Sequence, residues 1–94
     1  MSVTKTVTFI AKEGHEEELR ALLTMMVAPS KAENGCELYE IFEHKQTPGK
    51  FLVVESWANE AALDGHKASS HYAKYKSSFE PHCAFKSSDD LEFL

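Results

Sequence analysis

Ninety-four residues are enough for one small domain with a thin core, because a chain of this size buries only about 60–65% of the surface that it exposes when unfolded. A formal net charge of −5, with ten scattered basic residues, argues against a nucleic-acid or anionic-membrane partner, since phosphate binding needs concentrated positive potential. The N-terminus lacks a signal-peptide pattern and no window has the apolar length of a membrane span, so we expect a cytoplasmic protein.

The N-terminal third predicts a strand followed by an amphipathic helix. Residues 3–11 are rich in β-branched and aromatic side chains, which favour a strand. The acidic run after Gly14 suits the first turn of a helix that begins near His15, because negative charge complements the positive end of the helix dipole. Apolar residues then recur at helical spacing, at Leu19, Leu22, Leu23 and Met26. Pro29 should end or kink this helix.

Two further strands are predicted to pair as an antiparallel hairpin. The first is the apolar run of residues 36–42, and the second, at residues 51–57, is the best defined strand of the chain. Between them lie Pro48 and Gly49, a dipeptide that is typical of tight connections. The hairpin therefore occupies the middle of the predicted fold.

The C-terminal third predicts two short helices with a bend between them, and then a last strand. Asn59 is a good N-cap for the first helix, and helical character resumes after Ser69. We expect the last strand at residues 83–86 and 91–94, interrupted by a polar turn at residues 87–90. The resulting order, β-α-β-β-α-β, predicts the α+β class with a ferredoxin-like antiparallel sheet and its helices on one face.

The second hairpin strand is apolar on both faces, which predicts self-association. Leu52 and Val54 share one face, because side chains alternate along a strand. The other face carries Phe51, Val53 and Trp57, and we expect the sheet of a second subunit to cover it. The prediction is a homodimer with one small-molecule pocket per subunit. The alternative is a monomer with a partly solvated sheet, which antiparallel sheets permit.

Glu55 is the most informative charged residue. A carboxylate in the middle of this apolar strand must be paired, hydrated in a cavity, or shifted in pKa. One interpretation gives it a structural partner, such as Arg20, His44 or a backbone amide across the dimer. The other gives it a functional role in the pocket.

His66 and His71 lie five residues apart around the bend between the two predicted helices. A pair of imidazoles there could bind a polar substrate or move protons, or could hydrogen-bond at a helix end. We predict no metal, because this spacing does not place two ligands on one helical face. No glycine-rich nucleotide motif or nucleophile elbow occurs, so no cofactor is predicted. Trp57, Tyr72 and Tyr75 could stack on a flat aromatic ligand or simply form core.

Three segments together resemble the antibiotic-biosynthesis monooxygenase (ABM) family, including its quinol monooxygenases. They are residues 33–39, residues 55–57 with their Glu-Ser-Trp sequence, and residues 66–72 with two histidines five apart. The resemblance implies a single ABM-like domain over residues 1–94 that forms a dimeric α+β barrel. In the oxidative members it also implies cofactor-independent oxygenation of a hydroquinone or polyphenol in a pocket between sheet and helices.

The resemblance also assigns candidate roles. His66 or His71 would be the base that deprotonates the substrate, Glu55 would orient, and Trp57 and Phe51 would form the pocket wall. The predicted catalytic residues are therefore His66, His71 and Glu55, and the predicted substrate-binding residues are Phe51, Val53, Trp57 and Tyr72. Two alternatives stay open: an isomerase of a small polar, autoinducer-2-like substrate, and a dimer that binds a small molecule without chemistry.

Overall fold

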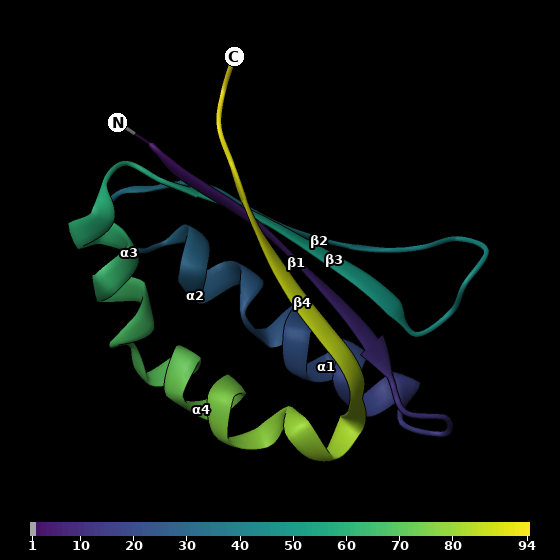
Figure 1. Cartoon of the computed structure of the whole chain (residues 1–94). Helices are drawn as coiled ribbons and strands as arrows, with labels where there is room; N and C mark the ends of the chain where they lie inside the picture. The colour runs from purple at the N-terminus through teal and green to yellow at the C-terminus, as the bar shows by residue number, and fades with distance from the viewer. Residues whose placement is uncertain (1) are drawn as a thin grey trace.

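The computed structural model, which describes residues 2–94, has one antiparallel sheet with its helices packed on one face (Figure 1). The elements in chain order are β1 (Val3–Ala11), α1 (Glu16–Met25), α2 (Val27–Lys31), β2 (Cys36–Glu43), β3 (Lys50–Trp57), α3 (Glu60–Lys67), α4 (Ser70–Ser78), the 3-10 turn η1 (Glu80–His82) and β4 (Cys83–Leu91). The strand order is β2-β3-β1-β4. This is the predicted ferredoxin-like β-α-β-β-α-β fold, which is confirmed.

The helix boundaries follow local signals in the sequence. The first helical run is interrupted at Met26, before Pro29, which has no N–H to donate. The Asn59 side chain accepts a hydrogen bond from the Ala62 N–H at 2.9 Å, and Ser69 likewise caps α4. These caps fix where α3 and α4 begin, and the Ser69 cap lies at the bend between the two helices. Within residues 2–94, no helix has both the length and the apolar character that crossing a membrane requires.

The helices cover the opposite face of β3 from the one that we expected. Phe51, Val53 and Trp57 are buried under the helices, so the prediction that their face stays open for a second subunit is wrong. Alternation along a strand defines two faces but does not say which one the helices cover. The face with the larger apolar side chains packs on the helices, and the face with Leu52 and Val54 is the open one.

β4 is continuous, so the predicted polar turn at residues 87–90 is wrong. Ser88 pairs with Val7 of β1 and Asp90 with Lys5, whose ammonium lies 2.7 Å from the Asp90 carboxylate. Because β4 lies at the edge of the sheet, its polar side chains reach water while its backbone stays in the ladder. The continuous strand extends the sheet beside β1 along most of its length.

Gly35 lets the start of β2 approach α3 closely. Its φ is +83°, in the left-handed region that favours glycine, and an added Cβ would lie 2.6 Å from the Cβ of Ala62. Its carbonyl accepts a hydrogen bond from the Ala58 N–H at 2.8 Å. The turn at residues 32–35 is thereby held against the first turns of α3.

Arg20 of α1 pairs with Glu43 at the end of β2, and not with Glu55. Arg20 Nε donates to Glu43 Oε1 and Nη2 to Oε2, both at 2.7 Å, and the Gly49 N–H donates to Oε2 at 3.0 Å. The hydrogen bonds from Arg20, and then that from Gly49, lower the pKa of Glu43 to about 2.

We expect Gly35→Ala to destabilise the fold more than Gly14→Ala. Both positions have a positive φ, at a cost of about 1 kcal/mol for alanine, but nothing lies within 4 Å of a Cβ added at Gly14. The clash with Ala62 should add about 1–3 kcal/mol at Gly35. Urea unfolding of both variants measures the difference, and equal losses of stability would show that the approach to α3 is not tight.

We expect the stability advantage of wild type over Glu43→Gln to depend on pH. Folding lowers the pKa of Glu43 from its ordinary value of 4.5 to about 2. The stabilisation from the ionised Glu43 is therefore complete above pH 4.5 and is lost as the pH falls to about 2. Urea unfolding between pH 7 and pH 2 should show the two midpoints converging. A gap that stays constant across this range would contradict the assignment.

Candidate functional site

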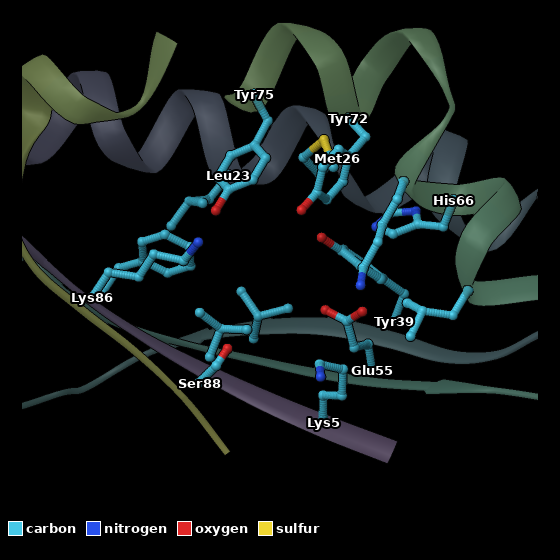
Figure 2. Close-up of a pocket in the computed structure, with 15 residues that line it drawn as sticks. Lys5, Leu23, Met26, Tyr39, Glu55, His66, Tyr72, Tyr75, Lys86 and Ser88 are labelled. Carbon is cyan, nitrogen blue, oxygen red and sulfur yellow. The ribbon is translucent and has the colours of Figure 1, made fainter. Parts of the chain in front are cut away.

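A cavity of about 190 Å³ lies between the sheet and the helices (Figure 2). Its floor is the helix-facing side of all four strands, and α1, α3 and α4 contribute to its roof. The polar and charged residues that line it are Lys5, Tyr39, Glu55, His66, Lys67, Tyr72, Tyr75, Lys86 and Ser88. The apolar ones are Val7, Phe9, Leu23, Met26, Val53 and Leu63. The pocket therefore lies within one subunit, on the helical side of the sheet.

Glu55 is a buried carboxylate that points into this cavity (Figure 2). Its Oε1 accepts a hydrogen bond from the indole Nε1–H of Trp57 at 2.9 Å. Lys5 is its cross-strand neighbour on β1. A hydrogen bond to Asp90 chiefly, and the charge of Glu55 in addition, raise the pKa of Lys5. Glu55 is thus held by neighbours on the sheet while it faces the space above.

His66 is 2% exposed and is fixed on two sides. Its Nδ1 lies 2.6 Å from Oε2 of Glu33, so Nδ1–H donates to the carboxylate. Its ring lies against that of Trp57 in a tilted arrangement, with centroids 4.5 Å apart and planes 30° apart. Because Nδ1 is used by Glu33, the other nitrogen, Nε2, is the one left for the cavity that His66 lines. A carboxylate on one imidazole nitrogen makes the other a proton acceptor of defined orientation.

His71 reaches the same carboxylate from the other side of the bend. Its Nε2 lies 2.9 Å from Glu33 Oε2, and its side chain is partly exposed. His71 is not among the residues that line the cavity. Sequence reasoning did not identify Glu33 as a site residue, because it lies in a turn more than thirty residues before both histidines. The one sequence signal was Gly35, two residues later, which marks a turn that could approach another element closely.

Glu33, His66 and His71 are also the residues that could hold a metal ion. Their ligand atoms all lie within 4.8 Å of one another, and two imidazoles with one carboxylate form a common ligand set. The spacing argument against a metal does not apply, because the helix is interrupted between α3 and α4 and both rings converge. The contacts of 2.6 and 2.9 Å fit direct hydrogen bonds. The predicted absence of a metal stays a prediction.

Three tyrosine hydroxyls converge on the cavity. Burial raises the pKa values of Tyr39, Tyr72 and Tyr75, and in each case a nearby charged or titratable group adds to the effect. Their hydroxyls therefore stay protonated and can donate hydrogen bonds to a bound molecule. Figure 2 shows the hydroxyls of Tyr72 and Tyr75 pointing from α4 toward the floor.

Lys86 closes the end of the cavity opposite His66 (Figure 2). Its ammonium lies 5.0 Å from the ring centroid of Phe79, 5.7 Å from that of Tyr75 and 5.8 Å from that of Phe9. Partial desolvation by its neighbours is the main cause that lowers the pKa of Lys86, although the residue as a whole is exposed. Sequence reasoning missed this residue because its strand was expected to break off there.

The predicted site residues divide into two groups. Those that line the cavity are Val53, Glu55, His66 and Tyr72. Phe51, Trp57 and His71 lie outside the lining. Trp57 donates a hydrogen bond to Glu55, which lines the cavity. His71 contacts Glu33, the hydrogen-bond partner of His66. Phe51 lies in the core beneath Arg20.

Comparison with known proteins matches the chain to one protein family. The family model described as "Antibiotic biosynthesis monooxygenase" matches residues 2–78. A relative from Mycobacterium tuberculosis, named "Putative monooxygenase Rv0793", is 35% identical over 72% of this chain. The matched segment spans 66% of that relative's length.

Solved structures agree over the whole fold. PA3566 from Pseudomonas aeruginosa superposes with a TM-score of 0.95 at 31% identity, covering 99% of this chain and 94% of that one. The structure of Rv0793 from Mycobacterium tuberculosis gives a TM-score of 0.93 at 28% identity, with coverage of 100% and 96%. The chain belongs to the antibiotic biosynthesis monooxygenase family, whose fold is that of the dimeric α+β barrels.

Proposed function

We propose that the protein is a cytoplasmic, cofactor-independent monooxygenase that acts on a small hydroquinone or polyphenol. The observation that carries the proposal is His66, whose Nδ1 is held by Glu33 while its Nε2 is left for the cavity. A base must lie within hydrogen-bond reach of the proton that it removes, and only His66 of the two candidate histidines lines the pocket. His66 is therefore the proposed base, and Glu33 its positioning residue.

The chemistry needs little from the protein beyond proton transfer. Once His66 removes a hydroxyl proton, the anion of the hydroquinone is electron-rich enough to reduce O2 itself. One oxygen atom enters the ring and the other leaves as water, so a hydroquinone plus O2 gives a hydroxyquinone plus water. The substrate supplies all the electrons, and this balance requires no external reductant.

The remaining lining residues suit this reaction. Val7, Leu23 and Val53 give an apolar middle in which a ring can lie flat and water is excluded. Glu55, fixed by Trp57, can orient a second hydroxyl or pass a proton across the ring from His66. The protonated tyrosines supply donors for oxygen atoms that gain charge.

We also propose that two copies associate through the open face of the sheet. Exposed or half-buried apolar side chains gather on this face: Ile10, Leu38, Phe42, Leu52, Val54, Phe85 and Leu91. Four of them are at least 39% exposed, and an apolar surface of this extent is unusual on a monomer. The family's dimeric barrel fold supports the same arrangement.

An isomerase is the second candidate. Two proton-transfer groups, His66 and Glu55, line one pocket, and moving a proton from one carbon to another needs such a pair. Turnover of a small hydroxyketone in the absence of oxygen would favour this function over oxygenation.

We expect His66→Gln to lower oxygen consumption with simple hydroquinones by about 100-fold or more, because the general base is lost. His71→Gln should have a smaller effect, since His71 reaches the pocket only through Glu33. An oxygen electrode measures uptake above the autoxidation blank, with EDTA present to test independence from metal.

The matched control is His44→Gln, an exposed histidine in the β2–β3 connection that should leave uptake unchanged. Wild-type uptake no greater than the blank would sink the oxygenase for the compounds tried. An equal loss in the His66 and His71 variants would instead mean that the base has been wrongly assigned.

We expect Val54→Lys to convert the wild-type dimer to a monomer of 10.6 kDa, because it places a charge in the middle of the open face. Thr24→Lys, on the exposed side of α1, is the control and should remain dimeric. Light scattering after size exclusion gives the masses. A monomeric wild type at micromolar concentration would refute the proposed interface.

A further inference from the structure

The charge of the pocket is opposite in sign to that of the whole protein. The chain carries a formal charge of −5, yet three lysines and a single carboxylate line the cavity. Charges of one sign in a cleft with apolar walls focus the potential on whatever enters. Lys5 is already paired with Asp90, at 2.7 Å, but no salt bridge among residues 2–94 includes Lys86 or Lys67.

Lys86 stands apart from the other two lysines in its surroundings. The rings of Phe9, Tyr75 and Phe79 surround its ammonium, and rings stabilise a cation without neutralising it. The residue as a whole is exposed, and no carboxylate of residues 2–94 forms a salt bridge with its ammonium, which leaves the charge available to an anion. The hydroxyls of Tyr75 and Ser88 line the same cavity and add donors near this end.

The two ends of the cavity are set apart by the sheet register. Lys86 lies opposite Phe9, and Glu55 lies opposite Lys5, four residues away along β1. That separation is about 13 Å between backbone positions. Figure 2 shows the same order, with Lys86 at one end and His66 and Glu55 at the other. A substrate whose hydroxyl meets His66 therefore extends toward Lys86.

We infer that the pocket selects a single-ring hydroquinone that carries a carboxylate, and that Lys86 binds this carboxylate while the hydroxyl meta to it meets His66. The inference rests on the proposed function of the pocket. A cavity of about 150 Å³ is known to hold benzene, so about 190 Å³ suits one substituted ring. One ammonium with hydroxyl donors matches a carboxylate, whereas a phosphate, with a charge near −2, favours several cationic donors.

The test compares 2,5-dihydroxybenzoate with its methyl ester by calorimetric titration without oxygen, so that binding is measured apart from turnover. We expect the carboxylate to bind wild type at least about tenfold more tightly than the ester, since the ester lacks the charge. Lys86→Met should remove this preference, so that the two compounds bind with similar affinity. Lys74→Met, on the exposed side of α4, is the control and should keep the preference.

The inference would be overturned if the two compounds bound wild type equally well, or if neither bound. It would also be overturned if the preference for the carboxylate survived in both Lys86→Met and Lys86→Gln. A preference that depends on Lys86 without oxygen consumption supports anion recognition while the oxygenase fails. Oxygen consumption that is equally efficient with the ester supports the oxygenase and overturns the selection for a carboxylate.

Discussion

The hydrogen bonds that Glu33 accepts from two imidazoles hold the site together. One carboxylate oxygen in the turn before β2 joins His66 at the end of α3 to His71 at the start of α4. The bend between these helices is therefore locked to the sheet by side chains rather than by the chain itself. Because Gly35 brings the turn close to Ala62, the carboxylate reaches rings that would otherwise lie too far away.

Trp57, at the end of β3, supports the same histidine from the side of the sheet. Its ring lies against His66 while its N–H donates to Glu55, so one fully buried side chain places both groups that can transfer protons. An indole that has no access to the cavity thus decides the geometry inside it. Trp57 therefore shapes the candidate site from outside the cavity lining.

Much of the fold could be predicted because its signals are local. The alternation in β3, the cap at Asn59 and the break near Pro29 each depend on a few neighbouring residues. Which sheet face the helices cover depends on the packing of the whole chain, and that prediction was wrong. The last strand was predicted, but its polar middle at residues 87–90 was expected to form a turn, because pairing with β1, and not its own composition, keeps that segment extended. Glu55 and His66 stood out as polar residues in apolar or bent segments, whereas Glu33 and Lys86 acquire their roles only through partners distant in sequence.

Alternation along the two central strands separates two properties of the molecule. Successive residues of β1 and β3 point in turn to the cavity and to the open face, as Val53 and Val54 do. A point substitution at a cavity-facing position can therefore alter which molecules the pocket admits without changing the open face. A substitution on the open face can likewise leave the pocket unchanged. Insertions have no such freedom: one extra residue within either strand would turn every following side chain to the wrong side and exchange the two surfaces at once. Over evolutionary time, lineages with this architecture should diversify in these strands by replacement, and accept changes in length only in the connecting loops.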